Sequence, residues 1–221
     1  MAHAVHEVCD AREHVLKFQV VCADPPWGFS DGLKKMKDGV DRSAASQYRT
    51  MTAQQVKDLD VPSLVDQSGC LLALWVPGCM LQYGFDVMEA WGFTYKQNYV
   101  WVKTKKDAIA DSALKGHMDE CTSVGMGRLF RQCHELALIG TVGKLQPTLK
   151  NRSQRSVSFA RNAGHSIKPG KLQNSLELMF PAANCLEMFA RRRRPGWVCI
   201  GDGIHPGVNI DTAIDALKSL P

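Results

Sequence analysis

Residues 17–27 read KFQVVCADPPW, a short and mostly apolar run that ends abruptly in an acid, two prolines and a tryptophan. Because a proline has no backbone N–H and cannot continue a hydrogen-bonded ladder, the run predicts a buried strand that stops at Asp24 and gives way to a sharp loop. Ligands of open α/β sheets bind outside the carboxyl ends of the strands. The loop that begins at Asp24 is therefore the first candidate functional segment.

Apolar runs alternate with helical patterns along the rest of the chain. Apolar, β-branched and aromatic runs predict strands at residues 69–76, 93–103, 134–141, 156–161, 185–189 and 197–201. Helical patterns predict helices at residues 52–60, 80–91, 169–180 and 209–220. The strand, helix and strand over 69–103 indicate a βαβ unit. This alternation predicts a three-layer α/β/α fold with a mostly parallel sheet.

Two segments, 28–50 and 104–132, show no sustained periodicity and are long enough to be loops with a binding role. We expect a single domain over residues 1–221, because 221 residues amount to one domain of about 150 residues with long functional loops. There is neither an internal repeat nor a low-complexity segment.

The composition excludes several classes of protein. With 45% hydrophobic and 22% charged residues the chain is of ordinary globular type, and its net charge of +5 permits a polyanionic partner without requiring one. The 8 cysteines lie singly, without the Cys/His spacing of a zinc site, so we expect reduced thiols, no metal and a cytoplasmic location. No apolar run approaches the roughly 18 residues of a membrane span, and the N-terminus lacks the apolar core of a signal peptide. Secretion and membrane insertion are disfavoured.

The motif Asp24-Pro25-Pro26-Trp27 combines groups that suit one reaction. A carboxylate beside rigid prolines offers acceptor oxygens, its own and a backbone carbonyl, to an exocyclic amino group. An adenine amino nitrogen is a poor nucleophile because its lone pair is delocalised into the ring. Two acceptors that hold its hydrogens out of the ring plane favour in-line attack on a methyl sulfonium. The simpler alternative is a tight turn followed by a core tryptophan.

The sequence resembles the MT-A family of adenine N-6 methyltransferases, which carry Asp-Pro-Pro-Trp and act on messenger RNA or, in bacterial and phage relatives, on DNA. The resemblance covers most of residues 17–205. Besides the motif, it is carried in order by QYRTMT at 47–52, LWV at 74–76, VWVKT at 100–104, HE at 134–135 with LIG at 138–140, HSIKP at 165–169, EMFAR at 187–191 and WVCIGD at 197–202.

The resemblance implies a Rossmann-like fold that uses S-adenosylmethionine, with the catalytic motif ahead of much of the cofactor site. It implies that Asp24 and Pro25, within the catalytic set Asp24, Pro25, Pro26 and Trp27, hold the target amino group and that Trp27 stacks on the adenine. Asp24 is also expected near the methionine part of the cofactor. The other positions carried over are Lys168 at the cofactor carboxylate, Arg191 near its ribose, Gly201 and Asp202 after the last strand, Tyr48 as an aromatic gate and Glu135 as a hydrogen-bonding residue of the substrate pocket.

The chain departs from the family pattern beside Arg191. Residues 192–194 are three arginines where the messenger RNA enzyme has Pro-His-Asn, and Gly203 replaces a glutamine. The ribose contacts therefore stay open, and no residue in 5–10 is assigned to the adenine of the cofactor. The arginine run is either a solvated basic face or a contact for phosphates. Lys168, Tyr48 and Glu135 each have a purely structural alternative.

The sequence thus predicts an S-adenosylmethionine-dependent adenine N-6 methyltransferase whose partner is nucleic acid, as a monomer or homodimer. DNA is preferred over RNA because no zinc-finger, RNA-binding or partner-binding extension accompanies the catalytic region, as in small prokaryotic and phage relatives. The loops 28–50 and 104–132 are expected to read the nucleic acid. The alternatives are the same reaction on RNA, or a non-catalytic nucleic-acid-binding subunit; an intact Asp24-Pro25-Pro26-Trp27 motif speaks against the second.

Overall fold

A computed structural model describes residues 16–28, 50–105, 121–125, 129–146, 148–162 and 167–219 of the chain. Most of the expected loop 28–50, including Tyr48, lies outside these residues, as does the middle of the loop 104–132. The described strands are β1 (Val20–Ala23), β2 (Gly69–Val76), β3 (Thr94–Thr104), β4 (His134–Gly143), β5 (Val157–Arg161), β6 (Cys185–Met188) and β7 (Trp197–Ile200). The described helices are the 3-10 turn η2 (Gly78–Met80) and the α-helices α1 (Ala53–Lys57), α2 (Leu81–Ala90), α4 (Lys171–Met179) and α5 (Ile210–Lys218).

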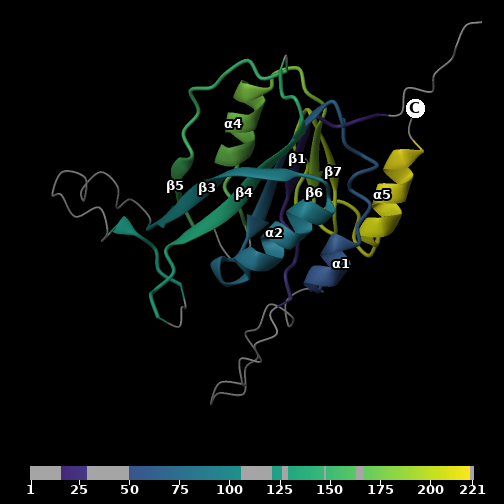
Figure 1. Ribbon diagram of the computed structural model, residues 1–221. Coiled ribbons are helices and arrows are strands. Elements are labelled where there is room, and N and C mark those ends of the chain that lie inside the picture. Colours follow the sequence, from purple (N-terminus) through teal and green to yellow (C-terminus); the bar gives the residue numbers. More distant parts are fainter. Residues whose placement is uncertain are drawn as a thin grey trace, which may run out of the picture.

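The described strands form one seven-stranded sheet in the order β5-β3-β4-β2-β1-β6-β7 (Figure 1). The neighbours β1–β2, β1–β6, β6–β7 and β3–β5 are parallel, whereas β4 runs antiparallel to both β2 and β3. The predicted mostly parallel sheet is confirmed. The unit β2–α2–β3 has parallel strands, as expected, but β4 lies between them. An apolar run predicts a strand without indicating its direction or its neighbours. The position of β4 between β2 and β3 could therefore not be predicted from the sequence.

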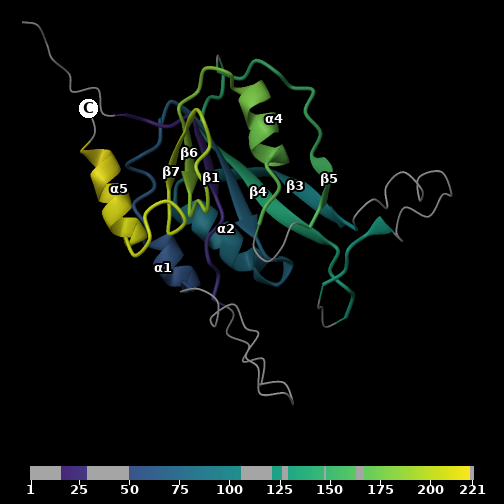
Figure 2. The ribbon, with the colours of Figure 1, turned by 180° about the vertical axis from the view of Figure 1, so that it is seen from behind.

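Both faces of the sheet are covered, which gives the predicted three layers (Figures 1 and 2). β2 is buried along its whole length because its alternate side chains enter two separate cores. Leu72 and Leu74 pack on the side of α1, α2 and α5, while Leu71 and Trp75 pack on the side of α4. Among the described helices, none has the length and apolar character needed to cross a membrane.

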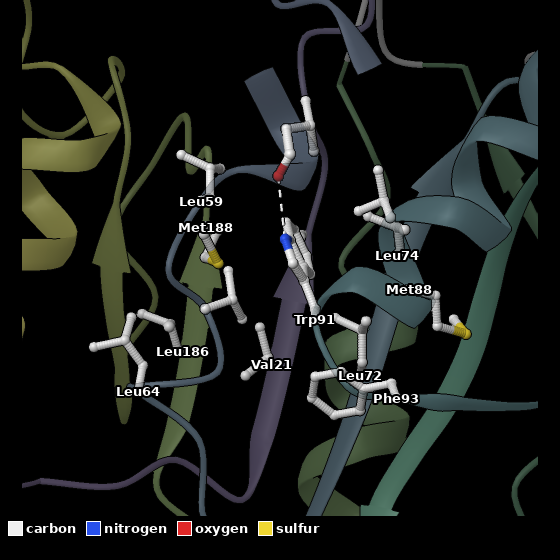
Figure 3. Close-up of a cluster of buried hydrophobic side chains, with 14 of the residues drawn as sticks. Val21, Leu59, Leu64, Leu72, Leu74, Met88, Trp91, Phe93, Leu186 and Met188 are labelled. Atoms are coloured by element: carbon white, nitrogen blue, oxygen red, sulfur yellow. Dashed lines mark hydrogen bonds between the residues drawn. The ribbon is translucent and has the colours of Figure 1, made fainter. Parts of the chain in front are cut away.

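The core beneath α1 and α2 fixes the position of the chain before α1 (Figure 3). Trp91, only 1% exposed, follows α2 and donates its indole N–H to the carbonyl oxygen of Val56 in α1 at 3.1 Å. Thr52 and Gln55 form a capping box at the start of α1, which satisfies backbone N–H groups that have no partner within the helix. Met51, directly before this cap, is thereby held against the end of β1, where the candidate site begins.

Candidate active site

The candidate site lies at the end of the sheet that is formed by the carboxyl ends of the parallel strands. Because β4 runs in the opposite direction, it begins at this end. Ligands of open α/β sheets bind at such an end. Residues that line two pockets there come from every strand: Asp24 after β1, Trp75 and Val76 in β2, Lys103 in β3, Glu135 in β4, Asn162 after β5, Arg191 after β6, and Gly201 and Asp202 after β7.

Backbone hydrogen bonds hold the Asp-Pro-Pro-Trp corner in one conformation. The N–H of Trp27 donates to the carbonyl oxygen of Pro25 at 2.8 Å, and that of Met51 donates to the carbonyl of Pro26 at 2.8 Å. Gly28 returns a bond to the Met51 carbonyl, also at 2.8 Å. With two proline φ angles already fixed, this corner presents Asp24 at a defined position.

Trp27 forms part of the wall behind Asp24. Its side chain is 4% exposed, and its indole N–H donates to the Trp75 carbonyl oxygen at 2.9 Å. The residue lines one of the two pockets. Most of the ring packs in the core, as in the core-tryptophan alternative.

Four side chains of alternating charge form a chain of ion pairs across the site. The ammonium of Lys168 lies 2.8 Å from both carboxylate oxygens of Asp24 and 3.2 Å from Oε2 of Glu135. The other Glu135 oxygen lies 2.6 Å from Nζ of Lys103. Lys168 also lies 5.5 Å from the centre of the Trp75 ring, within the range of a cation–π contact. The four charged side chains are 15–28% exposed, so water screens them only partly.

The ion pairs shift the acid–base behaviour of these groups. Burial raises the pKa of Asp24 above its usual range, and Lys168 opposes that shift. Burial acts to raise the pKa of Glu135 too, but Lys168 and Lys103 outweigh it and lower that pKa. Burial acts to lower the pKa of Lys168, and the two carboxylates outweigh it and raise that pKa. Lys168 and Glu135 are thus held in their charged forms, whereas the site favours the charged form of Asp24 less than water does.

A first pocket, called the acidic pocket here, has a volume of about 650 Å³. Among the described residues, its charged lining consists of the single cation Arg191 and four carboxylates, namely Asp24, Asp58, Asp202 and Asp211. Met51, Phe189, Val208 and Ile210 add apolar surface. The pocket suits a ligand with a positive charge, an apolar body and hydrogen-bond donors such as hydroxyl groups.

The backbone at the far end of the acidic pocket is unusually close-packed. A Cβ on Gly201 would lie 2.4 Å from the backbone nitrogen of Ala190, and one on Gly203 would lie 2.3 Å from Cα of Arg191. Phe189 has φ +61°, the one positive value among the described non-glycine residues. Such strain, about 1–2 kcal/mol, concentrates at ligand sites. Glycine at 203 is therefore required by the approach of the two loops.

A second pocket of about 570 Å³, called the basic pocket here, lies on the other side of Asp24. Within the part of the chain that the structure describes, its charged lining contains two carboxylates, Asp24 and Glu135, and four cations, namely Lys103, Arg131, Lys168 and Arg191. Trp27, Trp75 and Pro77 give it flat apolar walls. Asp24, Pro26 and Arg191 line both pockets, so the corner lies in the partition between them.

The expected site residues within the described part of the chain gather at these pockets. Pro25, Trp27, Lys168 and Glu135 line the basic pocket, and Gly201 and Asp202 line the acidic pocket. Asp202 already accepts a hydrogen bond from the backbone N–H of Gly207 at 3.0 Å. In the arginine run, Arg194 bonds to Glu177 at 2.7 Å and to Asn174 at 2.6 Å, so this member is neither solvated nor available to phosphate. Tyr48 lies outside the described residues.

Several lining residues were not expected from the sequence. Sequence alone places Lys103 among scattered surface charges and Trp75 in the core, and it gives no reason to select Arg131, Gln132 or Asn162. Lys103 reaches Glu135 because β3 and β4 pair antiparallel, with Trp101 opposite Glu135 and Val102 opposite His134. Only a prediction that residues 94–104 pair antiparallel with 134–143 would have placed Lys103 beside Glu135.

Comparison with known proteins agrees with this geometry. The sequence profile of the MT-A70 family matches residues 18–203. The Type II methyltransferase M.MunI of a Mycoplasma species is 28% identical over 194 residues, 82% of this chain and 75% of the relative.

Longer relatives match over a smaller share of their own length. The N(6)-adenosine-methyltransferase MT-A70-like protein of Drosophila melanogaster is 30% identical over 86% of this chain and 28% of the relative. The catalytic subunit METTL3 of the Homo sapiens N(6)-adenosine-methyltransferase is 28% identical over 86% of this chain and 29% of the relative. This chain thus spans three quarters of the first relative's length and less than a third of the other two. Since the profile covers all seven described strands and most of the residues that line the two pockets, the chain belongs to the MT-A70 family.

Proposed function

We propose that the protein transfers the methyl group of S-adenosylmethionine to the exocyclic 6-amino group of adenine in DNA. One observation carries the proposal: Asp24 lies in the partition between an acidic and a basic pocket. A cationic methyl donor and a base from a polyanion need two adjoining pockets of opposite charge. The acceptor that aligns the base must lie where the two pockets meet.

The acidic pocket fits the proposed cofactor. S-adenosylmethionine carries a sulfonium and an ammonium against one carboxylate, so its net charge is positive, and about 650 Å³ is an ordinary volume for a ligand of this size. Asp202 offers acceptors for hydroxyl groups beside the close-packed Gly201 and Gly203. Lys168, expected at the cofactor carboxylate, lines the basic pocket instead, and its three N–H groups face three oxygens of Asp24 and Glu135, so here it positions Asp24. When bound, the cofactor supplies an electrophilic methyl group.

Asp24 acts as the acceptor that orients the target nitrogen. Each carboxylate oxygen keeps a lone pair besides the one that faces Lys168, and the Pro25 carbonyl keeps one besides the one that faces the N–H of Trp27. Two acceptors at this fixed corner hold the amino hydrogens so that the nitrogen lone pair points toward the acidic pocket. Lys168 favours the charged form of Asp24, the stronger acceptor, and so opposes the rise in pKa that burial causes. The surplus proton of the methylated nitrogen leaves to water afterwards, so no general base is required.

The basic pocket receives the adenine and the adjoining backbone. Trp27, Trp75 and Pro77 offer apolar walls for a flat ring. Glu135, ionised and held by two lysines, offers an acceptor to the base. The positive charges of Lys103 and Arg131 attract the phosphates on either side of the target adenine.

DNA as the substrate is supported by the match to most of the length of M.MunI, a Type II methyltransferase. The relatives named as adenosine methyltransferases favour the same reaction on RNA, which is the second candidate. A monomer or homodimer in the cytoplasm completes the proposal, and light scattering after gel filtration measures the oligomeric state.

The test uses labelled S-adenosylmethionine with DNA and with RNA, followed by identification of the methylated nucleoside. The wild-type protein is expected to form N-6-methyladenine in DNA, and Asp24→Ala to form none. Product in RNA alone selects the second candidate. Absence of product from the wild-type protein on both polymers rejects the catalytic proposal, and calorimetry then shows whether the cofactor binds at all.

A further inference from the structure

Two neighbouring apolar side chains project into solvent beside the basic pocket. Leu129 is 93% exposed and Phe130 is 88% exposed. The next most exposed large apolar side chain of the described residues is Leu178, at 57%. Single exposed apolar residues are ordinary, but two adjacent, almost fully exposed ones are unfavourable in water relative to burial. A binding role accounts for that exposure.

The pair belongs to a hairpin that is firmly attached to the site. The backbone N–H of Gly125 donates to the carbonyl of Gln132 at 2.7 Å, which closes the hairpin. At its base Lys103 donates to Cys133 and accepts from Ser123, each at 2.8 Å. Lys103 is also the residue that pairs with Glu135 inside the basic pocket. These bonds join the two described arms of the hairpin, 121–125 and 129–133, to the end of β3, and Figure 1 shows the arms standing away from the sheet beyond the start of β4.

The hairpin also forms the rim of the basic pocket. Val124 and Gly125 on one arm, and Arg131 and Gln132 on the other, line the cavity. Phe130 is thus one residue away from a side chain that faces the pocket. Val124, which also lines the cavity, is 52% exposed.

We propose that Leu129 and Phe130 are a wedge that enters the base stack of a DNA duplex next to the target adenine. This inference rests on the proposed function and adds to it that a paired adenine is the substrate. An adenine inside a duplex cannot reach Asp24, so it must leave the stack, which costs the stacking and pairing energy of that base. Apolar side chains inserted between base steps fill the gap and offset that cost.

The charge around the hairpin favours nucleic acid over an apolar protein partner. The pocket at its base has four cationic side chains against two carboxylates among the described residues, and Arg131 directly follows Phe130. This combination of two exposed apolar side chains with cations beside them matches bases flanked by phosphates. A protein interface at the same residues is an alternative that the experiment separates.

The experiment compares the wild-type protein with Leu129→Ala/Phe130→Ala, and with Leu178→Ala on α4 as a matched exposed control. The substrates are three oligonucleotides around one adenine that the wild-type protein methylates in plasmid DNA: the paired duplex, the same duplex with an abasic site opposite the adenine, and the single strand. The double variant is expected to lose roughly 10- to 100-fold in kcat/KM on the paired duplex and less than about threefold on the other two. Leu178→Ala is expected to match the wild-type protein on all three.

A second readout does not depend on catalysis. With 2-aminopurine in place of the target adenine, the wild-type protein is expected to raise the fluorescence of the duplex as the base leaves the stack, and the double variant to raise it much less. Unchanged kcat/KM on the paired duplex, or an equal loss on all three substrates, overturns the wedge. An equal loss together with conversion of a dimer to a monomer identifies a protein interface instead. A wild-type protein that transfers no methyl group rejects the proposed function, whereas a wild-type protein and a double variant that methylate the paired duplex equally well reject the wedge alone.

Discussion

The ammonium of Lys168 lies 2.8 Å from both carboxylate oxygens of Asp24, a residue 144 positions earlier in the sequence. The same ammonium lies 3.2 Å from Glu135, so one cation balances two partly buried acids. This arrangement joins the end of β1, the start of β4 and the segment before α4. It makes Lys168 both a stabilising residue and the residue that sets the charge of Asp24.

Replacement of Lys168 by methionine is expected to lower the free energy of unfolding by about 1–3 kcal/mol, because both carboxylates lose their shared partner while they stay largely buried. The expected loss of stability is smaller than for a fully buried ion pair, because the three side chains are 15–28% exposed. Urea unfolding measures it. Lys218→Met is the matched control, because Lys218 also bridges two acids, Asp60 and Asp215, but at the surface. An equal or larger loss for the control would contradict the account.

The acid limb of the pH–activity profile is expected to move in opposite directions in two variants. Transfer requires ionised Asp24, whose pKa burial raises, so activity falls as the pH drops through that raised value. The charge of Glu135 raises the pKa of Asp24 and that of Lys168 lowers it. Glu135→Gln should therefore shift the limb to lower pH, and Lys168→Met should shift it to higher pH. Profiles of kcat at saturating cofactor and DNA test this, and shifts of the same sign in both variants would refute it.

Gly203→Ala is expected to weaken cofactor binding by about tenfold or more, because the new Cβ would lie 2.3 Å from Cα of Arg191 and push apart two loops of the acidic pocket. Gly196→Ala is the control. Gly196 has φ +77°, and a Cβ at this position would have no atom within 4 Å, so alanine there adds backbone strain of about 1–2 kcal/mol without touching the pocket. Calorimetry with S-adenosylmethionine should show wild-type affinity for the control. Wild-type affinity for Gly203→Ala would show that the approach of these loops does not shape the pocket.

Trp27→Phe is expected to reduce the free energy of unfolding by about 1–2 kcal/mol, because the Trp75 carbonyl loses a buried donor and the smaller ring leaves space. Methyl transfer by the folded variant should stay within about tenfold of wild type, since phenylalanine keeps an aromatic ring at this position of the basic pocket. Denaturant unfolding and kcat/KM on the same preparation give the two values. Unchanged stability with a large loss of activity would assign the ring to base stacking alone.

The sequence predicts the limits of the helices and strands better than it predicts which strands pair with each other. β2 is expected at 69–76 and lies there, because an uninterrupted apolar run bounded by Gly69 and Pro77 leaves little choice of limits. The insertion of β4 between β2 and β3 depends on long-range pairing, which neither periodicity nor propensity encodes.

The same distinction applies to the site. The rigid corner at Asp24 follows from local sequence, since two prolines after a strand fix the backbone. Only the family resemblance indicates Lys168. The sequence does not indicate Lys103, because its contact with Glu135 exists only once β3 and β4 are paired. Contacts between residues distant in sequence depend on the topology of the sheet.

The most direct test of the central claim is the single-turnover rate of methyl transfer by Asp24→Asn with saturating cofactor and DNA. Asparagine keeps the shape of the side chain but removes its charge and one of its two acceptor oxygens. We expect a rate about 100- to 1,000-fold below wild type, measured at a cofactor concentration that saturates each protein. A rate within a few-fold of wild type would contradict the role of the carboxylate in aligning the adenine amino group.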